Sequence, residues 1–305
     1  MRLFKAKDSN LLVLLCHIGA ILTVSIWGGS FVWTRVLTQE GLSAVEVYIY
    51  RFAIAYALIW IFCHKKLFSA SVKDEILMAL CGICGGSIYF LLENNAVIYT
   101  LPSNVSLLTT LAPLVTTILI GMIYKNERPG KWIWIGSAIA IFGVAMIIFK
   151  NGFKLTVAPL GDLLALSASF SWALYSLVLR KIDANYSALF ITRKTFFYGL
   201  LTALPFFFTE PRLTPMSTLL KPDVILNILI LAVGASLIAY FIWSLSVKTL
   251  GAIKASNYLY IQPIATMVIS AIQYDDDPIT AVGCAGCALI IGGVWLGDRM
   301  NRRKA

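Results

Sequence analysis

Glu93 is the residue of this sequence with the clearest chemical potential, because it lies in the apolar run YFLLENNAVIY at residues 89–99. A carboxylate within a membrane-length apolar segment is costly to bury and usually has a function. It could bind a coupling proton or a cationic group of a substrate. It could equally be a structural acid that pairs with Arg35 or Arg51. Loss of water favours the protonated carboxyl and a nearby arginine favours the carboxylate, so these roles stay open.

Aromatic and amide side chains in other apolar runs form a second group of candidates. Trp27 and Trp172 lie in the middle of their runs, whereas tryptophans that only anchor a protein lie at the membrane interface. A buried indole needs a hydrogen-bond partner or a cavity, and a buried asparagine needs a partner as well. The alternatives are interfacial anchoring for the tyrosines and close helix packing for the hydroxyl residues. The predicted substrate-binding residues are Trp27, Tyr89, Glu93, Asn94, Asn104, Thr110, Trp172, Tyr175, Tyr240, Trp243 and Tyr258.

Other residue patterns argue against metal, nucleotide and enzymatic chemistry. The CxxC pairs Cys81/Cys84 and Cys284/Cys287 supply two thiols each, fewer than the four ligands of a structural zinc site. The sequence contains no GxxxxGK[ST] loop, which disfavours direct use of ATP. The acidic run at residues 275–277 has no companion histidine. We therefore expect no cofactor, no metal and no enzymatic activity.

Three basic residues and two glycine-rich stretches also lie within the apolar runs. Arg51, Arg193 and Lys194 could bind an anionic substrate group. We favour the simpler interpretation that their charged ends reach the membrane surface by snorkelling. The glycines of 82–86 and 292–297 predict close packing of helices.

Apolar helices must position all of these residues, because 59% of the 305 residues are hydrophobic and only 13% are charged. Soluble proteins have about 25% charged residues. A helix needs roughly 20 apolar residues to cross the hydrocarbon core. The sequence therefore predicts an all-α integral membrane protein with ten transmembrane helices and no extramembrane domain. The expected spans are 11–35, 45–63, 76–98, 104–124, 131–149, 160–179, 187–208, 224–247, 253–273 and 278–297.

The distribution of positive charge indicates how these spans are oriented. The net charge of +10 could suggest nucleic acid as a partner, but no segment outside the spans is long enough to fold into a basic surface. Lys and Arg instead gather in the connections on the side of the N-terminus, which the positive-inside rule places in the cytoplasm. We expect a multi-pass protein of the cell (inner) membrane with both termini cytoplasmic, and no nucleic-acid partner.

The sequence also repeats itself, and the repeat divides the chain into two domains. The first, residues 1–153, contains spans 1–5, and the second, residues 154–305, contains spans 6–10. Because five is an odd number, the second half must have the opposite orientation in the membrane. The basic connection 125–131 is then cytoplasmic and its acidic copy 275–277 is external. Matched residues include Pro113 and Pro263, Trp27 and Trp172, Glu127 and Asp277, and Gly136 and Gly286.

These duplicated motifs resemble the drug/metabolite transporter (DMT) superfamily, and specifically its EamA-type ten-helix transporters. The likeness covers essentially the whole chain, although Asp277 lies where the family usually has Glu. It implies two inverted five-helix repeats and transport, but it does not imply a particular cargo. The motifs of the first half are Trp27-Gly28, Arg51, Pro113 and the series Glu127, Gly136, Gly143 and Val144.

Together, the residues and the resemblance predict a secondary transporter that moves a small polar metabolite. An amino acid or related solute, carried outward by alternating access, is the expected cargo. The alternatives are a flippase for lipids or lipid-linked substrates and, less favoured, a membrane enzyme. The expected partners are a small-molecule solute, the lipid bilayer and, in one interpretation of Glu93, a coupling proton. The pattern favours neither a monomer nor a dimer.

Overall fold

The computed structural model of the protein describes residues 2–64, 66–99, 105, 108–124, 129–148, 159–182, 186–273 and 279–302. These residues form helices and connections, with no strand among them. Helices occur at all the predicted apolar segments, so the all-α fold class is confirmed. They are α1 (Arg2–Gln39), α2 (Ala44–Phe62), α3 (Val72–Gly82), η1 (Ile83–Ser87), α4 (Ile88–Tyr99), α6 (Ala112–Ile123), α7 (Lys131–Ile148), α8 (Pro159–Lys181), α9 (Ala188–Phe208), α10 (Met216–Leu219), α11 (Pro222–Leu229), η3 (Ile230–Ile238), α12 (Ala239–Leu250), α13 (Ala252–Asn257), η4 (Tyr258–Ile261), α14 (Gln262–Gln273) and α15 (Ala281–Arg302).

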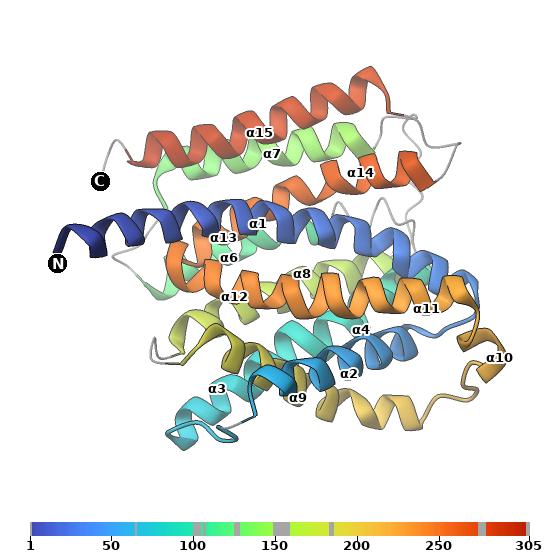
Figure 1. The fold of residues 1–305 in the computed structure, drawn as a ribbon. Coiled ribbons are helices and arrows are strands. Elements are labelled where there is room, and N and C mark those ends of the chain that lie inside the picture. The colour runs from blue at the N-terminus through green and yellow to red at the C-terminus, as the bar shows by residue number, and fades with distance from the viewer. Residues whose placement is uncertain are drawn as a thin grey trace.

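The helices run roughly along one direction, and the start of α1 lies at the same end of the bundle as the end of α15 (Figure 1). Five helical stretches are long and apolar enough to cross a membrane. Three shorter helices are also apolar, namely 112–123, 131–146 and 281–297. The long stretches are Asn10–Gln39, Ala44–Phe62, Val72–Tyr99, Pro159–Lys181 and Pro222–Leu250.

Two of these long stretches contain a π-helical segment in the middle. Segment η1 separates α3 from α4, and η3 separates α11 from α12. Each packs against a helix of the other half of the chain, η1 against α9 and η3 against α2. Glycine lets η1 approach α9 closely, since a Cβ added to Gly86 would lie 3.2 Å from the Gly199 Cα atom. Single-turn π segments occur often at functional sites.

Helices α7 and α15 pack closely against each other at one side of the bundle (Figure 1). A Cβ on Gly136 would lie 2.4 Å from the Gly293 carbonyl oxygen, and one on Gly293 would lie 2.6 Å from that of Gly136. Small residues let membrane helices approach in this way. The close packing predicted for Gly293 is confirmed, whereas Gly292 has no atom within 4 Å of its added Cβ.

Candidate functional site

A pocket lies at the centre of the bundle, between helices of the two halves. The space between its walls is about 410 Å³, of which only about 20 Å³ can hold the centre of a water molecule. About one such sphere of space is the minimum that a buried water needs, so the walls are close together in this conformation. The lining residues are Trp27, Ser30, Tyr89, Phe90, Glu93, Thr109, Ala112, Trp172, Leu259 and Gln262.

Close contact between α1 and α14 builds one wall of this pocket. At Gly28 the helices approach so closely that an added Cβ would lie 2.6 Å from the Gln262 carbonyl oxygen. The Thr266 hydroxyl also donates a hydrogen bond to the Gly28 carbonyl oxygen at 2.9 Å. The neighbouring side chains Trp27 and Gln262 therefore both reach the pocket.

The two tryptophans predicted from the repeat meet face to edge at the pocket. The rings of Trp27 and Trp172 lie 5.0 Å apart, at 86° to each other. The ring centroids of Tyr89 and Trp172 are 4.9 Å apart, and those of Trp243 and Trp27 are 5.1 Å apart. Edge-to-face pairs at these separations are favourable beyond the area they bury. Both halves of the chain thus contribute to a single aromatic wall.

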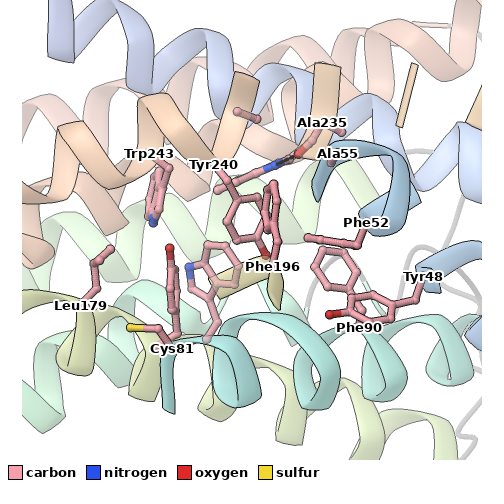
Figure 2. Close-up of a cluster of buried hydrophobic side chains, with 14 of the residues drawn as sticks. Tyr48, Phe52, Ala55, Cys81, Phe90, Leu179, Phe196, Ala235, Tyr240 and Trp243 are labelled. Carbon is pink, nitrogen blue, oxygen red and sulfur yellow. Dashed lines mark hydrogen bonds between the residues drawn. The ribbon is translucent and has the colours of Figure 1, made fainter. Parts of the chain in front are cut away.

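Behind this wall lies a continuous layer of buried rings, which Figure 2 shows around Tyr240. The ring centroid of Phe52 lies 5.1 Å from those of Phe90 and Phe196, and the centroids of Phe196 and Tyr240 are 5.5 Å apart. Tyr240 donates its hydroxyl proton to the Gly85 carbonyl oxygen of η1. The layer joins α2, α4, α9 and α12, so it fixes the position of the wall in front of it.

The two pocket indoles differ in their hydrogen bonding. Trp27 Nε1 donates to the Ala235 carbonyl oxygen of η3 at 2.8 Å. Trp172 is only 3% exposed, and its Nε1 has no acceptor among the described residues. A buried donor without a partner costs about 1–3 kcal/mol, so this N–H has unused hydrogen-bonding capacity beside the pocket.

Glu93 lies at the pocket with an incomplete set of partners. The residue is 7% exposed, and the Tyr89 hydroxyl, one helical turn earlier, lies close enough to interact with its carboxylate. Arg51 is close enough to interact electrostatically with it. Among the described residues, however, no ion pair joins Glu93 to Arg51. The structural alternative expected from the sequence was pairing with Arg35 or Arg51, and its Arg51 form is absent from this conformation.

The interpretation of the three buried basic residues as snorkelling side chains is wrong. Arg51, Arg193 and Lys194 are 1%, 2% and 4% exposed, so none presents its charged end to the surface. Lys194 forms an ion pair with Glu75, and Arg193 donates to carbonyl oxygens of the α2–α3 connection, including that of Cys63. These partners lie far away along the chain, where sequence spacing does not show them.

Ten of the eleven predicted site residues are described, and they fall into three groups. Trp27, Tyr89, Glu93 and Trp172 line the pocket, and Tyr175, Tyr240 and Trp243 pack behind it in the aromatic cluster. Three others lie away from the pocket lining. Among these, Asn94 donates to the Ala44 carbonyl oxygen at 3.0 Å, and the Tyr258 hydroxyl contacts His17 Nδ1 at 2.5 Å. Thr110 is buried at 2% exposure beside the lining residue Thr109, and Asn104 lies outside the described residues.

Several lining residues are absent from the predicted site. Ser30 and Gln262 both carry a signal that sequence reasoning overlooked. Ser30 follows Trp27 by three residues, so it lies on the same helical face. Gln262 is an amide within a predicted span and immediately precedes the repeated Pro263. Leu259 and Ala112 carry no such signal, because an apolar residue in an apolar helix does not reveal which way it faces.

The pocket therefore offers one acid, one free indole N–H, aromatic faces and small polar groups. A carboxylate beside aromatic rings suits a cationic group such as an ammonium. The N–H of Trp172 and the amide of Gln262 suit a hydrogen-bond acceptor. Among the described residues, no three His, Cys, Asp or Glu side chains come together as metal ligands. The pocket is suited to a small molecule that carries both charge and hydrogen-bonding groups.

Comparisons with known proteins agree with this arrangement. The model of the EamA-like transporter family matches the chain twice, over residues 14–149 and 159–297. An uncharacterized transporter of Archaeoglobus fulgidus is 24% identical over 92% of this chain and 96% of its own. The "Probable amino-acid metabolite efflux pump" of Escherichia coli is 25% identical over 91% of this chain and 92% of its own. The "Probable terminal-alkyne amino-acid exporter" of Streptantibioticus cattleyicolor is 27% identical over 93% of this chain and 94% of its own.

The fold has also been seen in a solved structure. A crystal structure with 19% sequence identity superposes with a TM-score of 0.72, over 96% of this chain and 98% of the other. That likeness supports the fold alone. The two matches to the family model cover most of the sequence, and the apolar helices account for its composition. The chain therefore belongs to the EamA-like transporter family, within the drug/metabolite transporter superfamily, and is a multi-pass membrane protein.

Proposed function

We propose that this protein is a secondary transporter that exports a small polar metabolite, such as an amino acid, by alternating access. The observation that carries the proposal is the pocket at the centre of the bundle. Its walls come from both halves, with Trp27 and Glu93 from one and Trp172 and Gln262 from the other. Because the walls leave little free space, relative movement of the halves would open the pocket to one side of the membrane at a time.

The proposal includes ten spans arranged as two inverted five-helix repeats, residues 1–153 and 154–305. The matched π segments support it, because each half places one in its third apolar segment. Each segment also accepts a hydrogen bond from an aromatic side chain of the other half. Trp27 donates to Ala235 in η3, and Tyr240 donates to Gly85 in η1. The positive-inside rule then places both termini in the cytoplasm; the acidic connection at 275–277, proposed as external, lies outside the described residues.

The chemistry of the pocket supports an amino acid or a related solute. An ammonium group would bind between the Glu93 carboxylate and the aromatic faces of Trp27 and Tyr89. A carboxylate or carbonyl group would accept from the free N–H of Trp172. This cargo agrees with the names of the Escherichia coli and Streptantibioticus relatives, which refer to efflux of amino-acid metabolites and export of an amino acid.

Tracer exchange in liposomes tests the proposal. Purified protein is reconstituted into vesicles preloaded with unlabelled amino acids, and uptake of each labelled amino acid is measured. Trp27→Ala and Trp172→Ala should each lower exchange of the transported solute by about tenfold, because each removes part of the pocket wall. Trp295→Ala, at a residue that is 56% exposed on α15, is the matched control and should exchange normally.

Folded protein is quantified for every variant by gel filtration, so that loss of transport is separated from loss of protein. Wild-type exchange by both pocket variants at wild-type abundance would contradict the proposed site. If no solute exchanges but a labelled lipid moves between leaflets in the same vesicles, the alternative lipid flippase would replace the transporter.

A further inference from the structure

Arg51 of α2 is a buried cation whose hydrogen bonding is only partly satisfied. It is 1% exposed, and its Nε donates to the Ser236 hydroxyl oxygen of η3 at 2.9 Å. Its Nη2 is buried and has no acceptor within the described residues. The guanidinium carbon lies 4.7 Å from the centroid of the Phe90 ring and 5.2 Å from that of Phe52. Such stacking stabilises the cation but does not replace the missing hydrogen bond.

The missing acceptor has an evident counterpart in Glu93. Phe90 and Glu93 are three residues apart on α4, so they lie on neighbouring positions of one helical face. Arg51 lies against Phe90 and interacts electrostatically with Glu93 without forming an ion pair. Phe90 and Glu93 line the pocket, whereas Arg51 is not part of its lining. The guanidinium is thus next to the acid but outside the space that a substrate would occupy.

The partners of Arg51 belong to different halves of the chain. Ser236, which accepts the hydrogen bond from Arg51 Nε, is in η3 of the second half. Arg51 in α2 and Glu93 in α4 both belong to the first half. Movement between the halves would break the bond to Ser236 and leave Arg51 beside Glu93. A carboxylate buried without any counter-charge is strongly unfavourable. A carrier that releases its cargo must still return through the membrane with that carboxylate.

We propose that Arg51 is the internal counter-ion of Glu93, which pairs with the acid after the cargo has left and so permits return of the empty carrier. In the conformation described here, the guanidinium is bonded to Ser236 and forms no ion pair with Glu93, so the acid is open to a ligand. In the return step, Arg51 takes the place of the ligand's positive charge. This inference rests on the proposed function, because only a carrier needs an empty return.

The test separates exchange from net transport in proteoliposomes. Exchange needs only the loaded carrier, whereas net efflux needs the empty carrier to return as well. Arg51→Gln should therefore keep counterflow exchange within about twofold of wild type and lower net efflux by about tenfold. Arg51→Lys, which keeps the positive charge, should retain most of the net efflux. Arg193→Gln is a matched control at another buried arginine, and it should change both fluxes in proportion to the amount of folded protein.

Ser236→Ala provides an independent measurement that does not alter Arg51. Without Ser236, the guanidinium competes with the substrate for Glu93, so KM for exchange should rise about fivefold. Adding Arg51→Gln should abolish that rise. An unchanged KM in Ser236→Ala would overturn the proposal, even if Arg51→Gln folds too poorly to assay.

The remaining outcomes are also decisive. Equal loss of exchange and net efflux in well-folded Arg51→Gln would show that Arg51 acts in substrate binding or the loaded step, and normal values of both would show that it has no role. Either result would overturn the inference while leaving wild-type transport intact. Absence of any solute flux from the wild-type protein would instead contradict the proposed function itself.

Discussion

Glu75 and Glu93 lie in the same helical stretch, Val72–Tyr99, and each has a basic residue near it on another helix, yet only one of the two acids is paired. Glu75 forms an ion pair with Lys194 of α9. It also accepts hydrogen bonds from the Tyr198 hydroxyl at 2.5 Å and from the Ser69 amide at 2.7 Å. Among the described residues Glu93 forms no ion pair with Arg51. The Tyr89 hydroxyl and Arg51 lie near its carboxylate, and Arg51 remains partly unsatisfied.

The difference separates a structural acid from a functional one. A fully paired and hydrogen-bonded acid holds its helices together and has no capacity left for a ligand. An acid with few partners gains little stability from its surroundings and can still bind a proton or a cation. Glu75, bound to Lys194 and Tyr198, therefore holds α3 against α9. The Glu93 carboxylate can instead bind a proton or a cation at the pocket.

Breaking the paired acid should give the largest change in stability. Glu75→Gln leaves Lys194, whose side chain is 5% exposed, without a counter-charge. Loss of one partner of a buried ion pair costs about 3 kcal/mol or more in free energy of unfolding. Chemical unfolding of the purified protein in detergent measures this loss. Glu40→Gln is the control, because its partner Lys221 is 53% exposed and such pairs contribute about 0–1 kcal/mol. If the two substitutions lowered the free energy of unfolding equally, the Glu75–Lys194 pair would not be a special stabilising contact.

Removing one neighbouring hydroxyl from each acid should sharpen the contrast with a smaller effect. Tyr198→Phe deletes the hydroxyl that donates to Glu75, and Tyr89→Phe deletes the hydroxyl that lies beside Glu93. We expect Tyr198→Phe to lower the free energy of unfolding by about 1 kcal/mol and to leave transport per folded molecule unchanged. Tyr89→Phe should instead alter KM for the transported solute. The opposite assignment, with transport sensitive to Tyr198 and not to Tyr89, would reverse our interpretation of the two acids.

Much of this fold could be predicted from the sequence, because membrane helices follow from apolar runs of sufficient length. The mid-run positions of Trp27 and Trp172, which correspond in the repeat, predict that both residues border the substrate path, and the structure brings their rings together. The acid at residue 93 was conspicuous for the same reason, since a single charge in an apolar run has few explanations.

The remaining features depend on packing between distant helices. Lys194 and Arg51 were interpreted as snorkelling residues because their partners, Glu75 and Ser236, lie on helices far away in the sequence. Asn94 faces α2 rather than the pocket because the crossing of α2 and α4 brings the Ala44 carbonyl oxygen to its amide. The π segments that shape the aromatic wall have no sequence signature that we could use. Side-chain direction within an apolar helix is set by such crossings, and the apolar pattern alone does not determine it.

The central claim, that Glu93 is the functional acid of the pocket, is tested most directly by Glu93→Gln. This substitution keeps the size of the side chain and a carbonyl oxygen that can accept a hydrogen bond, but it removes the charge. Net transport and the free energy of unfolding are measured on the same purified variant. We predict that net transport falls by about tenfold or more, while the free energy of unfolding changes by no more than about 1 kcal/mol, because the lost carboxylate had no ion pair. A well-folded Glu93→Gln protein that transports its solute at the wild-type rate, with the wild-type dependence on pH, would contradict the claim.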